Sequence, residues 1–383
     1  MKASVRLISG FLFIWNVLAL GQLYSPEGWR VASEQDDLWQ WDFDRVFRPQ
    51  SDFRTGWWYY TGHLKSDEGR QFGFQVTFFR IGMNPDPMAE AKTGGNSGWR
   101  FRDVWMGHLG ITDESGNQYH CRQRLVRGSA FLAGYEGSQT DTRLFLGDWT
   151  IERRSQSGSH HLDFEDAGWK LSLTLGEGRS VLQGENGVSR KSEGFGKASF
   201  YYSIPRMAVR GQLTTPDGDA LSVTGSAWFD REIGSSQLDR DQVGWNWFSI
   251  QFETGDCLML YQMRFEDGRE DPFAHGLWVP ASEKEPTVHL SAEDFSIQGK
   301  AMWKSRKTQG SYPTRWTLNV PVLDLELELR ATVKEQEFVS RSKPVISYWE
   351  GSHTVIGARD ERDVRGRAYV ELTGYAGRLP GLN

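Results

Sequence analysis

Residues 223–252, VTGSAWFDREIGSSQLDRDQVGWNWFSIQF, hold two strand-like stretches joined by a charged loop. From Ala220 to Asp230, alternate positions separate a mainly apolar set from a more polar set that includes Trp228 and Asp230. An alternation of period two predicts a strand, so Trp228 and Asp230 share one face of it. In Trp245–Phe252 large apolar side chains occupy both parities, which is typical of a strand that is covered on both sides.

The composition favours an all-β protein with two domains. The chain has 383 residues, including 17 Trp, 22 Phe and 42 Gly, and aromatic residues and turn-forming glycines suit many short strands. One domain per ~150 residues predicts two domains. We place the border in the charged loop between Glu232 and Val243, which gives domains at residues 22–235 and 236–383.

The net charge argues against one class of partner. It is −6, and no block of lysine or arginine interrupts the sequence. A nucleic-acid-binding protein carries a basic patch or stripe, so we expect no nucleic-acid partner.

The first 21 residues have the pattern of a cleavable signal peptide. Lys2 and Arg6 form a basic start, Leu7–Leu20 is the apolar run, and small residues end it at Gly21. The run is shorter than the ~20 apolar residues that span a bilayer. We therefore expect cleavage before Gln22 and a periplasmic or secreted location.

Two cysteines, Cys121 and Cys257, remain in the exported chain. An oxidising compartment permits them to pair, and two free buried thiols are the alternative.

The sequence lacks G-x-S-x-G, H-E-x-x-H, C-x-x-C and a phosphate-cradling glycine loop, so it predicts no metal ion and no cofactor.

Further strands are expected on both sides of the central stretch. Gly56–Gly82 reads as a hairpin of two aromatic-rich strands joined by a turn at Ser66–Gly69. Trp39, Trp41 and Phe43 alternate and predict an entering strand, and Pro85–Gly98 predicts a loop.

Aromatic residues with polar atoms supply the candidate ligand contacts. A cavity lined by rings with a few polar tips suits a large apolar ligand. His63 and His108 also lie in aromatic strands, although a core histidine bonded to a carbonyl is the alternative for each. The predicted ligand-binding set is Trp58, Tyr59, His63, His108, Tyr201, Tyr202, Trp245, Trp247 and Tyr261.

Seven stretches of the chain, taken together and in order, resemble one family. The stretches are WWYYTGHL (57–64), FGFQVTFFR (72–80), LQGENGVSRK (182–191), ASFYYSIPRM (198–207), VTGSAWFDREIGSSQL (223–238), GWNWFSIQF (244–252) and YVELTGY (369–375). In these stretches the chain is similar to the AttH-like, carotenoid 1,2-hydratase-related group, some of whose members are classed as secreted hydrolases. The resemblance runs from about residue 40 to the C-terminus.

The resemblance implies a fold and an activity. The fold is two lipocalin-like (calycin) antiparallel β-barrel domains packed together. The activity is the addition of water to the terminal double bond of acyclic carotenoids or related polyenes. The hydratase motif, an aromatic residue two positions before an acid, matches Trp228 and Asp230, which carries the catalytic role to these two residues. The chain departs from close relatives at Gly56, where they commonly have glutamate, and at Ile233, where they have tryptophan.

The chemistry of alkene hydration also allows Asp230 to be the acid. Hydration of an alkene needs an acid that donates a proton to carbon and aromatic faces that stabilise the resulting cation. An Asp230 buried among rings would have a raised pKa and could donate. A structural ion pair between Asp230 and Arg231 is the alternative.

Three functions therefore stand at this point. The first is a hydratase-like enzyme acting on a carotenoid, terpenoid or other lipid. The second is a periplasmic lipid-binding protein without turnover, and the third is a secreted hydrolase, against which the missing nucleophile motif argues. A hydrophobic ligand also allows peripheral contact with a membrane.

Overall fold

The computed structural model describes residues 23–85, 102–138, 141–236, 238–341 and 345–378. The expected signal peptide, residues 1–21, and all but the first residue of the expected loop Pro85–Gly98 lie outside these ranges. None of the helices in the described part of the chain has the length and apolarity needed to cross a bilayer.

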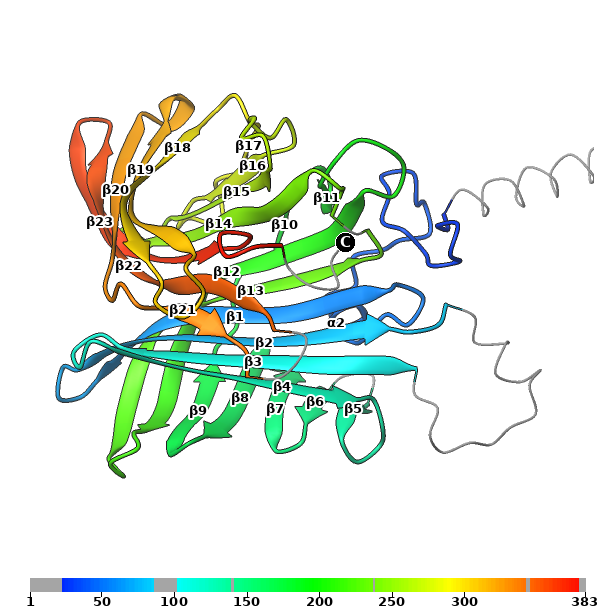
Figure 1. Ribbon diagram of the computed structural model, residues 1–383, viewed down its shortest axis with the longest axis horizontal. Coiled ribbons are helices and arrows are strands. Elements are labelled where there is room, and N and C mark those ends of the chain that lie inside the picture. Colours follow the sequence, from blue (N-terminus) through cyan, green and yellow to red (C-terminus); the bar gives the residue numbers. More distant parts are fainter. Residues whose placement is uncertain (1–22, 86–101, 139–140, 237, 342–344, 379–383) are drawn as a thin grey trace, which may run out of the picture.

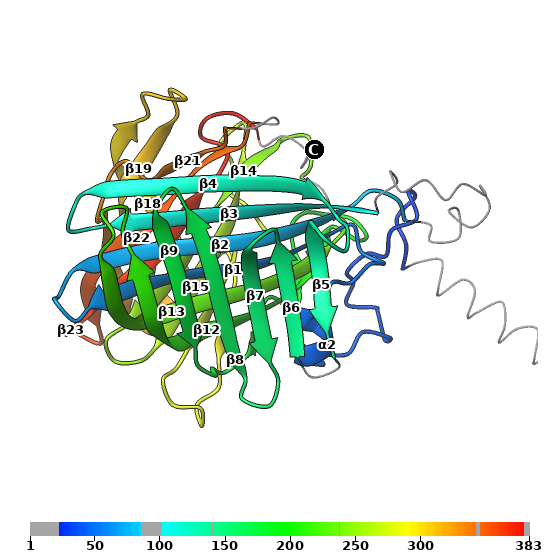
Figure 2. The same ribbon diagram turned by 90° about the horizontal axis from the view of Figure 1, so that it is seen from below.

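The all-β expectation is confirmed: the fold consists of two antiparallel sheets (Figure 1), one a nearly closed barrel and the other a half-barrel. The first sheet has thirteen strands, and its main path runs β4-β3-β2-β1-β13-β12-β9-β8-β7-β6-β5. Figure 2 shows β5 to β9 crossing the long strands β1 to β4 at a steep angle. The strands are β1 (Thr55–Ser66), β2 (Gln71–Gly82), β3 (Asp103–Asp113), β4 (Gln118–Arg127), β5 (Ala133–Gly137), β6 (Asp141–Leu146), β7 (Trp149–Arg154), β8 (Ser159–Asp166), β9 (Trp169–Leu175), β10 (Val181–Leu182), β11 (Val188–Arg190), β12 (Ala198–Thr214) and β13 (Ala220–Gly234).

The second sheet has ten strands in the order β17-β16-β15-β14-β23-β22-β20-β19-β18, with β21 paired to β22. The chain passes from the first sheet to the second between Gly234 and Gln242. The elements are β14 (Gln242–Phe252), β15 (Cys257–Phe265), β16 (His275–Val279), β17 (Val288–Leu290), β18 (Ser296–Lys304), β19 (Ser311–Val320), the 3-10 turn Pro321–Leu323, β20 (Leu325–Ala331), β21 (Glu337–Val339), β22 (Ser347–Arg359) and β23 (Arg362–Leu372).

Two local expectations have different outcomes. The hairpin at Gly56–Gly82 is confirmed as β1 and β2, and the amide of Gly69 bonds to the carbonyl of Ser66 in the turn. The entering strand at Trp39–Phe43 is wrong. Asp42 accepts two main-chain amides and caps the short helix α2 (Phe43–Phe47), because a side-chain oxygen at this position satisfies amides that a helix start leaves free.

Trp39 explains why the aromatic alternation was misleading. Its ring stacks on Phe200 of β12 with centroids 4.0 Å apart, and it meets Phe53 edge-on. The aromatic residues before α2 therefore pack onto the first barrel as a covering segment and need no strand partner.

Each sheet has its own core, and a third buried cluster lies between the sheets. We call this third cluster the aromatic layer. It is formed by strands of both sheets, so the two barrels pack together through it. Its buried members are Tyr59, Val181, Tyr201, Trp228, Trp247, Cys257, Met259, Tyr261, Met263, Leu277, Val279 and Tyr369.

Candidate functional site between the two sheets

One cross-strand row of the first sheet faces the aromatic layer. Reading across β3, β2, β1, β13 and β12, the paired residues are His108, Thr77, Tyr59, Asp230 and Ser203. Residues directly opposite each other in an antiparallel ladder point to the same face of the sheet. The register therefore brings residues from five strands to one surface.

A second row of the C-terminal sheet faces the first. Across β15, β14, β23 and β22 the paired residues are Tyr261, Trp247, Glu371 and Glu350. Two carboxyl side chains thus lie next to each other on this face, on neighbouring strands.

Direct bonds join the two rows. The hydroxyl of Tyr59 donates to Oε1 of Glu350 at 2.5 Å, and the indole nitrogen of Trp247 donates to the hydroxyl of Tyr201 at 3.2 Å. The rings of Tyr59 and Trp247 meet edge-on with centroids 5.1 Å apart. The site is therefore one connected network that needs both sheets.

Asp230 lies between Tyr59 and Ser203 in the first row, with 3% of its surface exposed. Its Oδ2 accepts from the Tyr201 hydroxyl at 2.7 Å, and its Oδ1 accepts from Ser203 at 2.5 Å and from the Trp228 indole at 2.7 Å. The shared face predicted for Trp228 and Asp230 is confirmed by this last bond. Burial raises the pKa of Asp230 to about 7, against the lowering effect of the three donors, and nearby Glu232 raises it further.

The two carboxyl groups of the second row are also perturbed. Burial raises the pKa of Glu350 well above its usual range, and the neighbouring Glu371 raises it further. Burial raises the pKa of Glu371 to about 7, while a 2.7 Å bond from the Trp245 indole lowers it and the Asp230 charge raises it. Since like charges disfavour one another, several protons are held in the layer near neutral pH.

A lysine closes one end of the aromatic layer. The ammonium of Lys191 lies 3.1 Å from Glu232 and 4.3 Å from the centroid of the Tyr261 ring. Ser199 also donates to Glu232. The charges at this end are paired with each other, and among the described residues no cationic side chain forms an ion pair with Asp230.

Arg231 lies on the opposite face of β13, so the alternative of an Asp230–Arg231 ion pair is wrong. Its guanidinium stacks 4.0 Å from the Trp58 ring, and burial lowers its pKa to about 9. Successive strand residues point to opposite faces, which separates Arg231 from Asp230. The guanidinium donates to four main-chain carbonyls, those of Val46, Arg48, Trp57 and Glu232, and so fixes the end of α2 against the barrel.

The predicted ligand-binding residues divide between two faces. Tyr59, Tyr201, Trp245, Trp247 and Tyr261 lie in or against the aromatic layer with the two predicted catalytic residues. Trp58 and Tyr202 instead lie in the core of the first barrel, and the structure separates them from Asp230. Each is the chain neighbour of a layer tyrosine and therefore points the other way.

The two histidines lie at the margins of the layer and have protein partners. His108 is bonded to the Tyr348 hydroxyl at 2.8 Å and to Gln123 at 3.1 Å, and burial lowers its pKa to about 3. His63 accepts from Arg367 at 3.3 Å, and burial lowers its pKa well below the usual range. Both rings are therefore neutral at physiological pH.

Sequence reasoning missed Glu350 and Glu371. Glu371 could have been identified from the sequence, because it belongs to the stretch YVELTGY that carries the family resemblance. Glu350 gave no local signal. Its role depends on a partner, Tyr59, that is 291 positions away in the chain.

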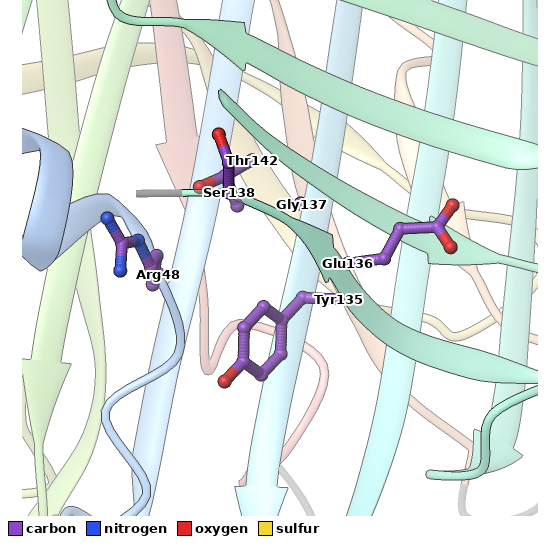
Figure 3. Close-up of a pocket in the computed structure, with 6 residues that line it drawn as sticks. All are labelled: Arg48, Tyr135, Glu136, Gly137, Ser138 and Thr142. Carbon is purple, nitrogen blue, oxygen red and sulfur yellow. The ribbon is translucent and has the colours of Figure 1, made fainter. Parts of the chain in front are cut away.

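Two surface pockets lie apart from the layer. The first, of about 350 Å³, is drawn in Figure 3 and is lined by Arg48, Tyr135, Glu136, Gly137, Ser138 and Thr142. The second, of about 440 Å³, includes Arg154, His161 and Arg210. The first pocket, which is lined by charged and polar side chains, does not suit a large apolar ligand.

The structure also bears on the state of the two cysteines and on metal binding. Cys121 and Cys257 are both free, so they do not form a disulfide; Cys257 is buried, whereas Cys121 is partly exposed. In the described ranges, no group of three or more His, Cys, Asp or Glu side chains is arranged to hold a metal ion.

Comparison with known proteins agrees with this fold. The family model described as AttH-like matches residues 34–375. A crystal structure of an AttH protein from Nitrosomonas europaea is 31% identical, with a TM-score of 0.75, and the match covers 88% of this chain and 97% of that one.

A second structure, kievitone hydratase from Nectria haematococca, is 15% identical with a TM-score of 0.66, and the match covers 93% of this chain and 98% of the other. At that identity it shows the fold alone. Among curated proteins, none is similar enough in sequence to be matched. The family match over most of the chain, together with the 31% identical structure, shows that this protein belongs to the AttH-like family.

Proposed function

We propose that this protein is a hydratase-type enzyme that adds water to a carbon–carbon double bond of a hydrophobic small molecule, of carotenoid, terpenoid or other lipid class. The observation that carries the proposal is Asp230, a carboxyl group buried among aromatic rings with a pKa of about 7. A hydratase of the same fold, which acts on kievitone by its name, supports this reaction class.

The first chemical step is a proton transfer to carbon. Protonated Asp230 donates its proton to one carbon of the double bond, so a C–H bond forms and the π bond breaks. The pKa of Asp230 suits this task, since about half of the groups still hold the proton at pH 7. Tyr201, Ser203 and Trp228 stabilise the carboxylate that remains by donating to its two oxygens.

The second step is capture of the carbocation. Water adds to the cationic carbon and then loses a proton, which gives the alcohol. Tyr59 is the cross-strand neighbour of Asp230, Trp228 is bonded to it, and Trp247 packs edge-on against both of these rings. A ring of this layer that turns its π face towards the substrate would stabilise the cation. The sum is alkene plus water to alcohol, without a redox change.

We infer that an apolar substrate would enter at the edge of the layer. Trp57, Leu238, Trp245 and Phe265 are only partly buried and pack against the layer from outside. An approaching lipid would therefore meet apolar side chains before it reaches Asp230, and these side chains must move aside because Asp230 is closed off from solvent.

We also propose that the protein is exported and works in the periplasm or outside the cell, on the basis of the sequence of residues 1–21. The expected mature N-terminus is Gln22, which mass spectrometry of the protein from the periplasmic or culture fraction would detect. An intact Met1 in the membrane fraction would contradict this location.

Asp230→Asn tests the reaction. The amide is nearly isosteric but cannot donate a proton to carbon, so we expect ligand binding to remain and the yield of alcohol to fall by at least ~10²-fold. The probes are kievitone and an acyclic terpenoid with a terminal trisubstituted double bond, incubated in deuterated water and followed by mass spectrometry.

Glu337→Gln is a matched control. Glu337 is also a fully buried carboxyl group, and it accepts from Ser305, Thr308 and Tyr312 in the second domain, away from the layer. Unchanged product yield from folded Asp230→Asn would end the acid role. Binding of the probes by wild type without any alcohol would favour a lipid-binding protein.

A further inference from the structure

A second carboxyl group faces Asp230 from the other sheet. Glu371 is paired in register with Trp247 on one side and with Glu350 on the other. Both neighbours touch the first sheet, Trp247 at Tyr201 and Glu350 at Tyr59. Glu371 must therefore point into the same layer, and Asp230 enters that layer from the opposite side.

Glu371 and Glu350 differ in their access to water. Glu350 is fully buried, and its Oε1 is occupied by the hydroxyl of Tyr59. Glu371 is half-buried, and its Oε2 accepts from the half-buried Trp245 at the edge of the layer. Of these two carboxyl groups, Glu371 is therefore the more accessible to solvent.

The protonation of Asp230 and Glu371 suggests different roles for these two carboxyl groups. Asp230 is almost completely closed off and has a raised pKa, as a proton donor requires. Glu371 has a similar pKa but is partly exposed, so its ionised form is less costly than that of a fully enclosed carboxyl group. One protonated and one ionised carboxyl group is also the arrangement that like-charge repulsion favours.

We propose that Glu371 is the second catalytic residue of the hydration, and that it accepts a proton from the water that attacks the carbocation on the face opposite to Asp230. This inference rests on the proposed function. A C–O bond forms, the water proton passes to the Glu371 carboxylate, and Glu371 then releases it to solvent. Asp230 recovers its proton from solvent, so the enzyme returns to its starting state.

The placement on opposing sheets fixes the stereochemistry. A flat double bond held between the sheets receives the proton from the first sheet and the hydroxyl group from the second. The two new bonds therefore form on opposite faces of the alkene, which is anti addition. A single carboxyl group that served both steps from β13 would instead give syn addition.

The test uses a terpenoid whose terminal double bond carries two methyl groups, one of them labelled with carbon-13, in deuterated water. Proton transfer and water addition then create two stereocentres. Wild-type protein should give the anti diastereomer, as read by nuclear magnetic resonance. A syn product would overturn the inference even though hydration itself would be demonstrated.

Glu371→Gln provides a second, independent readout. The variant keeps the acid Asp230, so it should still protonate the alkene reversibly and introduce deuterium into recovered starting material. Its alcohol yield should fall by ~10²-fold or more, because the base is lost. Asp230→Asn should abolish both exchange and hydration, and Glu337→Gln should affect neither.

The outcomes separate the two proposals. Wild-type alcohol formation that persists in folded Glu371→Gln would refute the role of Glu371 and leave the hydratase proposal standing. Absence of both exchange and alcohol in wild type would remove the hydratase proposal and the inference with it.

Discussion

Removal of the charge at Asp230 should change how stability depends on pH. Burial raises the pKa of this carboxyl group from the ordinary value of 3.8 to about 7 in the folded protein. The difference of about three pH units corresponds to ~4 kcal/mol, at ~1.4 kcal/mol for each unit. This is the free energy by which folding disfavours the ionised form.

The sign follows from proton binding. Between about pH 4 and pH 7 the folded protein retains the proton of Asp230, whereas the unfolded chain has released it. The contribution of Asp230 to stability is therefore complete at low pH and is lost as the pH rises towards the folded pKa. Asp230→Asn has no such titration, so its stability relative to wild type should increase by ~4 kcal/mol across this window.

Thermal unfolding of both proteins from pH 4 to pH 8 measures the effect. With roughly 2 °C for each kcal/mol in a chain of this size, the Tm of the variant should gain ~8 °C relative to wild type. Glu350 and Glu371 titrate in both proteins, so their direct contributions largely cancel in the difference. Parallel curves of Tm against pH would refute a raised pKa at Asp230.

Ser203→Ala is the matched comparison for this experiment. It keeps the carboxyl group but removes a donor that lowers the pKa of Asp230. The loss of stability should then extend to higher pH than in wild type. A shift towards lower pH would show that the bond from Ser203 does not stabilise the carboxylate.

Three further predictions concern the fold. Arg231→Leu removes the donor to four main-chain carbonyls, two of them in buried bonds, and should lower the free energy of unfolding by more than ~3 kcal/mol in urea titrations. Gly62→Ala places a Cβ atom 2.4 Å from a ring carbon of Phe74, so we expect a loss of ~1–3 kcal/mol and a lower Tm, whereas an unchanged Tm would show that the ring moves freely. Cys121 and Cys257 should both react with a thiol reagent after unfolding without reductant, and finding no free thiol would contradict the structure.

Much of the fold could be predicted because its signals are local. Strand alternation in Ala220–Asp230 and the hairpin at Gly56–Gly82 depend on residues that are close in sequence, and both have their expected form. The bond between Trp228 and Asp230 belongs to the same class, since residues two apart in a strand share a face. The misread segment Trp39–Phe43 shows the limit, because its aromatic residues pack on a distant strand.

The site itself was decided by tertiary structure. Asp230 could be singled out from its motif, but whether it met Arg231 or a set of neutral donors depended on which face of β13 each side chain occupies. Glu350 and Glu371 come from strands more than 100 residues further along the chain. Their place opposite Asp230 follows from the register of two separate sheets and from the way the barrels pack, and long-range pairing of this kind leaves no periodic pattern in the sequence.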